Sequence, residues 1–234
     1  MSFQPEYISG GTVGVSTGGG YGTQYGGGTT LVFSDLTGDH ELAVGGGVYG
    51  RLRDASLLFA YGNLSHRWQY ITGLSQDVAY LSTGYTQSQS GYQQSYQFLR
   101  YVMRSASITA EYPLNRFQRF EVGLSANAIG RGFVTQNYDF LSGSQSMTDG
   151  QSLGTLSYLS PDVAYVTDNS LFGVTGPISG RRMRFAVTPA VGSLRFMNYS
   201  ADYRRYDPIV FNALTFATRL FYTGSYGRDA DLLP

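Results

Sequence analysis

Long segments in which apolar and polar residues alternate follow one another along this chain. The clearest segment, residues 182–191, places Met183, Phe185, Val187, Pro189 and Val191 on one face, against Arg182, Arg184, Ala186, Thr188 and Ala190 on the other. A strand of a soluble sheet needs only about five or six residues. Longer strands with one apolar and one polar face suit a wall between lipid and a hydrated lumen. The pattern predicts an all-β fold, an antiparallel up-and-down transmembrane β-barrel, with residues 1–234 as one domain.

The composition agrees with a surface that avoids charge. Only 14% of the residues are charged, against about 25% in ordinary globular proteins. Twenty Tyr and fourteen Phe could supply the aromatic girdles of a membrane barrel. A net charge of zero gives no general attraction to nucleic acid. The alternative is a soluble, secreted, Tyr-rich β-protein such as an adhesin.

Several classes of feature are absent from the sequence. There is no Cys, which excludes disulfides and thiolate metal sites, and the sixteen basic residues are all Arg. No apolar run of about 18 residues predicts a transmembrane helix. The first residues lack the basic and apolar regions of a signal peptide, so we expect the chain to be part of a longer exported precursor.

We predict eleven strands. Their ranges are 7–17, 29–35, 40–50, 55–64, 68–81, 98–112, 120–134, 152–167, 182–191, 195–206 and 211–226, with a Gly-rich turn over 18–28. Short connections are expected at 37–39, 113–115 and 207–208, and long ones at 82–94, 137–150 and 168–180, of which 82–94 could instead be an extended strand pair. Because the long loops of outer-membrane barrels are extracellular, we expect all three long connections to point outward.

The arginines test the strand assignment, because an Arg facing lipid near the bilayer midplane costs about 2–4 kcal/mol. Alternation keeps the arginines in the middle of strands on polar faces. Arg104 and Arg205 instead share a face with apolar residues, near strand ends where a long side chain can reach the headgroups. Bacterial barrels close with an even number of strands, and eleven is odd. We therefore expect further strands after the C-terminal end.

The candidate functional residues lie on the predicted polar faces. These lumen-facing candidates are Glu111, Glu121, Arg182, Arg184, Asp202, Arg204 and Arg219. They could shape a pore or anchor an inward loop, or they could simply pair with one another, as polar residues in any lumen must. From residue 181 onward there are eight Arg and four Asp, which suggests an electropositive wall.

No motif indicates catalysis, a cofactor or a metal. His40 and His66 are the only histidines, and both are expected at solvated turns. The glycines of 18–28 lack the Lys-Ser/Thr and the helix of a phosphate loop. We therefore expect a protein that is not an enzyme and binds no cofactor.

Four segments carry a resemblance to a known family. Residues 168–182 (DNSLFGVTGPISGRR), 201–206 (ADYRRY) and 224–230 (GSYGRDA) resemble the barrel of the Omp85, or bacterial surface antigen D15, family. Residues 33–40 (FSDLTGDH) resemble the first hairpin of a subgroup whose barrel follows a TolB-like β-propeller. The resemblance implies a barrel of about sixteen strands, of which this chain holds about eleven, followed by an inward loop with an Arg-Gly-aromatic signature.

The resemblance also implies a function and partners. It suggests polypeptide assembly or translocation at the bacterial outer membrane, with lipid, lipopolysaccharide and unfolded polypeptide as partners. A periplasmic domain of the same precursor, propeller or POTRA repeats, is expected but is not found in this chain. A passive porin-like channel, or a barrel that anchors a periplasmic propeller, remains the alternative.

Overall fold

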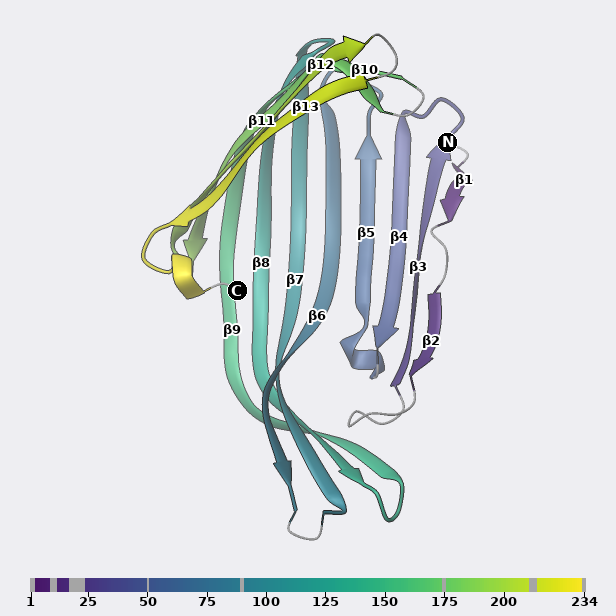
Figure 1. Cartoon of the computed structure of the whole chain (residues 1–234), viewed down its shortest axis with the longest axis vertical. Coiled ribbons are helices and arrows are strands. Elements are labelled where there is room, and N and C mark those ends of the chain that lie inside the picture. The colour runs from purple at the N-terminus through teal and green to yellow at the C-terminus, as the bar shows by residue number, and fades with distance from the viewer. Residues whose placement is uncertain are drawn as a thin grey trace. The chain divides into compact units, whose positions relative to one another are not determined.

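A computed structural model describes residues 3–8, 12–16, 24–49, 51–88, 91–173, 176–210 and 214–232, and these residues are almost entirely β-strand (Figure 1). The strands are β1 (Phe3–Ile8), β2 (Thr12–Ser16), β3 (Gln24–Asp35), β4 (His40–Tyr49), β5 (Ser56–Asn63), β6 (Gln69–Gln87), β7 (Gln93–Asn115), β8 (Gln118–Asp139), β9 (Ser144–Asp168), β10 (Leu171–Phe172), β11 (Pro177–Gly192), β12 (Phe196–Val210) and β13 (Leu214–Tyr226). Two 3₁₀ turns, η1 (Leu52–Asp54) and η2 (Ala230–Leu232), complete the described structure.

The strands follow one another through a single sheet. Their order is β1-β3-β4-β5-β6-β7-β8-β9-β11-β12-β13, with β2 beside β3 and β10 beside β11. Strands that are neighbours in the sequence are therefore neighbours in the sheet, which is the up-and-down topology that the alternation predicts. The predicted first strand, 7–17, is instead two short strands that both pair antiparallel with β3. None of the described helical segments has the length and hydropathy needed to cross a membrane.

The strands run further than the sequence pattern indicates. Residues 82–87 belong to β6 and residues 93–94 to β7, as in the extended strand pair considered for 82–94, and most of 137–150, predicted as a loop, belongs to β8 and β9. The two extensions are bonded together: the backbone N–H of Phe140 donates to Tyr92 O at 2.8 Å, and Ser95 donates to Asn137 at 2.6 Å. Backbone pairing supports these polar segments without an apolar face, so alternation does not reveal them.

The expected placement of the three long connections is wrong for 168–180. The Asp168 N–H donates to Phe117 O at 2.8 Å, so this connection lies beside the short turn between β7 and β8. Antiparallel neighbours require this, because consecutive connections of an up-and-down sheet alternate between its two ends. Connections 137–150 and 168–180 are consecutive and cannot share an end. The predicted short turn at 207–208 is also absent, since both residues continue β12.

The chain contacts divide the molecule into two compact units. Unit 1 is Met1–Tyr61, Gly73–Ala106 and Asn127–Ser157, and unit 2 is Gly62–Thr72, Ser107–Ala126 and Tyr158–Pro234.

The hairpin of β3 and β4, in unit 1, turns at Gly38, whose φ of 72° favours glycine. The Asp35 carboxylate accepts the N–H groups of Asp39 and His40. His40 is buried against the Tyr61 hydroxyl, 2.9 Å from Nδ1, so the expected solvated histidine is wrong at this position.

The two faces of unit 2 reverse the exposure found in a soluble protein. On β11, Phe185 is 47% exposed, whereas its neighbour Ala186, on the polar face, is 4% exposed. On β9, Val163 is 53% exposed and Ala164 is 1% exposed. The register pairs Phe185 with Tyr165 and Ala186 with Ala164, so these exposures belong to continuous faces across the two strands. The apolar face predicted from residues 182–191 is therefore the outward, exposed face.

The residues after β13 fold back onto the turn between β11 and β12. The Asp229 carboxylate accepts the Arg195 N–H at 2.9 Å, and the Asp229 N–H donates to Arg195 O at 3.2 Å. The Arg228 guanidinium, and then the Arg195 N–H, hold the pKa of Asp229 below its ordinary value. This contact ties the end of β13 to the beginning of β12.

We expect the Asp229 contact to be sensitive to acid. Because its pKa is lower in the folded than in the unfolded state, the charged carboxylate stabilises the fold at pH values above about 4. That contribution is lost as the pH falls through the lowered pKa. Asp229→Asn should reduce stability at pH 7, and its difference from the wild type should shrink in acid, as measured by urea unfolding across pH. A difference that stays constant with pH would contradict this assignment.

Candidate functional site

Glu121 is the centre of an ion-pair cluster on the polar face of unit 2. Its side chain is 8% exposed, and two arginines hold it from either side. Arg119, two residues earlier on β8, contacts Glu121 Oε1 at 2.8 Å, and Arg184 on β11 contacts Oε2 at 3.0 Å. Arg119 also reaches Glu111 on β7 at 3.2 Å. A carboxylate this buried requires such partners, because an unpaired buried charge is strongly unfavourable.

Asp202 on β12 forms the second centre. Arg204, on the same strand, approaches Asp202 Oδ2 at 2.6 Å, and Arg219 on β13 approaches it at 2.9 Å. Alternation places residues two apart on one face, and the register sets Arg204 opposite Arg219. The register between β11 and β12 sets Arg184 opposite Asp202, so Arg184, which also pairs with Glu121, lies between the two centres.

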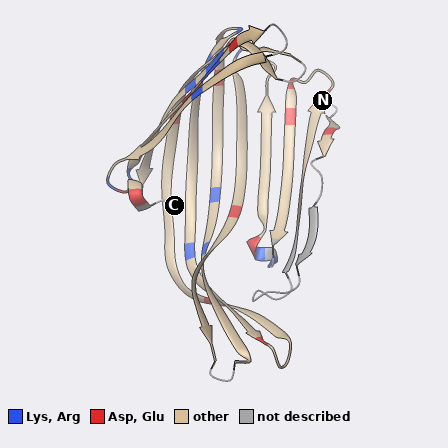
Figure 2. Ribbon diagram, viewed as in Figure 1, with Lys and Arg blue, Asp and Glu red and all other residues tan. Residues whose placement is uncertain are grey.

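All seven predicted site residues therefore share one face of unit 2 and engage in ion pairs. The seventh of these residues, Arg182, pairs with Asp168, and 3.5 Å separates the Arg182 Nε from the Asp168 Oδ2. Figure 2 shows the arginines of β11 and β12 close together on these strands. That this face lines a lumen stays a prediction. Arg119 and Asp168 were not among the predicted residues, although Arg119 is recognisable from its spacing of two residues before Glu121.

A glycine makes room for a further carboxylate in this cluster. A Cβ at Gly123 would collide with the Asp162 side chain and come within 3.2 Å of Thr109 Oγ1. Asp162 therefore lies over Gly123 of the neighbouring strand, on the face that holds Glu121. Gly123 lies two residues after Glu121, so alternation alone puts it on the same face but gives no reason for a glycine there. The close approach of Asp162 supplies one.

The predicted position near a strand end is wrong for Arg104, which lies in the middle of β7, but Arg104 and Arg205 both have polar partners. Arg205 shares a face with Tyr203, is exposed, and pairs with Asp207 at 2.9 Å. Arg104 Nε donates to Gln76 Oε1 at 2.8 Å. Both arginines are thus anchored by neighbours that the alternation alone does not reveal.

Unit 1 holds an ion-pair cluster that the sequence analysis did not identify. Its centre is Asp54 of η1, whose side chain is 2% exposed. It accepts bonds from Arg51 at 3.0 Å, Arg100 at 3.1 Å and the Tyr80 hydroxyl at 2.5 Å. Asp149 on β9 joins the cluster through Arg51 and Arg53. These residues come from four separate parts of the chain, so no local motif marks them.

The chemistry of both clusters is that of charge pairing. Among the described residues, no group of three or more His, Asp and Glu side chains has the arrangement of a metal site. His66 lies on the exposed surface, where its Nδ1 is 2.6 Å from the Ser65 hydroxyl. The arrangement can hold strands in register and present a polar, charged face to water.

The antiparallel, up-and-down sheet has the fold of a β-barrel wall. It is similar to BamA from Haemophilus ducreyi, in a crystal structure that lacks POTRA domains 1–3, with a TM-score of 0.52 and 14% identity. The similarity covers 93% of this chain and 42% of that one, so the chain spans less than half the length of this relative. No protein-family profile and no curated protein sequence matches the chain. The likeness confirms the predicted fold class.

We expect the two arginines of β11 to differ in importance. Arg184→Met removes one of the two partners of the buried Glu121 and should cost about 1–3 kcal/mol of unfolding free energy. Arg182→Met is the matched control on the same face. Its partner Asp168 is more exposed than Glu121, so this variant should lose about 1 kcal/mol of unfolding free energy or less. Urea titration of both refolded variants measures the difference. Equal losses would show that burial of Glu121 does not determine the stability of the cluster.

Proposed function

We propose that this chain forms part of the wall of a β-barrel in the outer membrane of a Gram-negative bacterium. The observation that supports this is the reversed exposure of the two faces, with Phe185 and Val163 exposed and Ala186 and Ala164 buried. Water would penalise such an exposed apolar face, whereas lipid would favour it. The similarity to the BamA barrel supports the same location.

The assignment of the two faces can be tested with two adjacent substitutions on β12. Ala201 pairs with Phe185 on the apolar face, and Ser200 pairs with Ala186 on the polar face. In a lipid-spanning wall, Ala201→Arg should cost about 2–4 kcal/mol and Ser200→Arg clearly less. Both are measured by urea unfolding of protein refolded in vesicles, with heat-modifiable gel migration as the check on folding.

The opposite ranking would contradict the proposal. In a soluble β-sandwich the apolar face is the dry interior, and Arg is disfavoured wherever the side chain is buried from water. However, the polar face would then be the solvated one and Ser200→Arg would be nearly neutral, so the ranking alone does not separate the two cases. The separating measurement is recovery of the wild-type protein in the membrane fraction after carbonate washing, where a soluble adhesin would be released.

The specific activity that we propose is assembly or translocation of polypeptide at that membrane, without enzymatic chemistry. The similarity to BamA supports it, and an unfolded polypeptide would be the partner. Vesicles that contain the chain should accelerate the folding of an added, urea-unfolded outer-membrane barrel, followed by its heat-modifiable band. Folding no faster than in empty vesicles would contradict the activity, although not the membrane location.

A passive channel is the second candidate, and the charged polar face of unit 2 favours it. From residue 181 onward there are eight Arg and four Asp, so a pore lined by these strands should pass anions more readily than cations. Reversal potentials across a planar bilayer under a salt gradient measure this preference. A preference for cations would exclude an electropositive wall.

A further inference from the structure

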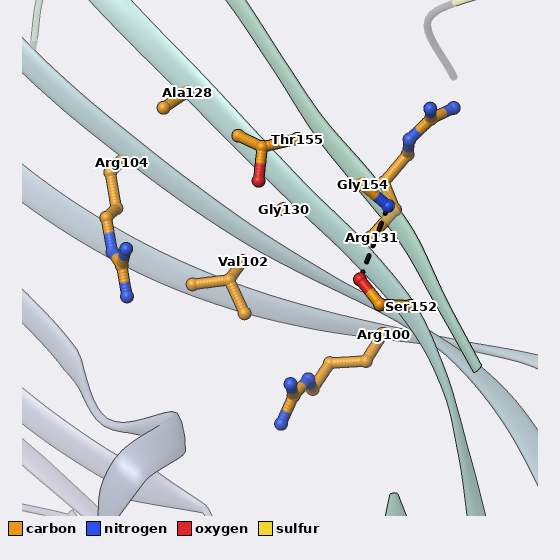
Figure 3. A pocket seen from close by; sticks show the side chains of 9 residues that line it. All are labelled: Arg100, Val102, Arg104, Ala128, Gly130, Arg131, Ser152, Gly154 and Thr155. Carbon is orange, nitrogen blue, oxygen red and sulfur yellow. Dashed lines mark hydrogen bonds between the residues drawn. The ribbon is translucent and has the colours of Figure 1, made fainter. Parts of the chain in front are cut away.

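A pocket lined by arginines opens on the strands of unit 1. It has a volume of 210 Å³, and its lining includes Arg100, Val102 and Arg104 of β7 together with Gly130 of β8 and Thr155 of β9 (Figure 3). One bound water needs only about 15 Å³. The pocket therefore has room for a small polar group as well as solvent.

The positive charge in this pocket is only partly neutralised. Arg104 contacts Gln76, and no carboxylate lies within ion-pair distance of it among the described residues. Arg100 uses Nη1 to bond Asp54 and lies 3.7 Å from Asp149, but its buried Nε has no hydrogen-bond partner in the described structure. A buried N–H without an acceptor is unfavourable, and no carboxylate balances the charge of Arg104. An anion in the pocket would accept a hydrogen bond from that N–H and balance that charge.

The opposite wall is small and carries a hydroxyl group. A Cβ added at Gly130 would lie 3.8 Å from Thr155 Oγ1 and 3.9 Å from the Val102 Cβ, in ordinary contact. Figure 3 shows the Thr155 hydroxyl on the side of Val102, while the head of Arg131 points away from Arg100 and Arg104. The two β7 arginines and Thr155 are thus the groups that could donate to a bound anion.

We propose that this pocket binds a phosphate-type oxyanion, held by Arg104 and Arg100 with Thr155 as an additional donor. Planar guanidinium groups match the oxygens of such an anion and form strong, charge-assisted hydrogen bonds with it. The phosphate could come from solution or from the headgroup of an anionic lipid. The site is independent of the assembly role and of the unit 2 cluster.

The first experiment titrates inorganic phosphate into the full chain refolded in maltoside micelles, which contain no phosphate, and follows ³¹P line broadening. Wild-type protein should bind saturably, and Arg104→Gln should weaken binding by about tenfold or more. Arg104→Lys should restore part of the affinity, because it keeps the charge. Arg116→Gln is the matched control: Arg116 also has no ion pair among the described residues, but it lies over Phe117 and does not line the pocket.

A second variant tests the site without removing charge. Gly130→Leu places a side chain in the pocket and should abolish binding while Arg100 and Arg104 remain. Heat-modifiable migration establishes that each variant is folded. If Arg104→Gln does not fold, the Gly130→Leu result decides.

The source of the phosphate is separated by native mass spectrometry of protein refolded with phosphatidylglycerol. Retention of this lipid by the wild type but not by Arg104→Gln indicates a headgroup site, whereas phosphate binding without lipid retention indicates a site for the free ion. The proposal is overturned if wild-type protein binds neither probe, or if Arg104→Gln or Gly130→Leu binds as the wild type does.

Discussion

The structure depends on strands whose two faces meet opposite environments. Along β11, each apolar residue on the exposed face has a neighbour on the polar face that is small or charged. Backbone groups must bond to the next strand wherever water is absent, so a face exposed to lipid requires continuous antiparallel pairing. The uninterrupted register from Gly180 to Ala190 against β12 meets that requirement. The other features of unit 2 follow from it.

The ion pairs are the consequence on the polar face. Once the apolar side chains point outward, the charged ones lie side by side on adjacent strands, about 5 Å apart. Glu121 takes arginines from its own strand and from β11, while Asp202 takes them from its own strand and from β13. Each of these two carboxylates thus has two guanidinium partners, which avoids unpaired buried charge and opposes a shift in register.

Unit 1 also contains a buried carboxylate that is paired with arginines. Asp54 lies in a 3₁₀ turn rather than a strand, and it pairs with Arg51 just before that turn, with Arg100 of β7 and with Tyr80 of β6. The Asp54 carboxylate does not pair with Arg104, which lies further along β7 than Arg100. In unit 2 each arginine of the cluster has a carboxylate partner, whereas Arg104 in unit 1 has none among the described residues. This difference distinguishes the arginine-lined pocket from a structural ion pair.

The sequence by itself determined the strand-rich fold, the assignment of residues such as Phe185 and Arg184 to opposite faces, and seven of the residues in the unit 2 cluster, without Arg119 and Asp168. These follow from alternation, which is a local property with a period of two residues. The tertiary structure alone decided the partners of Glu121 and Asp54, the burial of His40, the length of β8 and β9, and the end at which residues 168–180 lie. Those depend on which strands are neighbours and in what register, and residues far apart in the chain establish both.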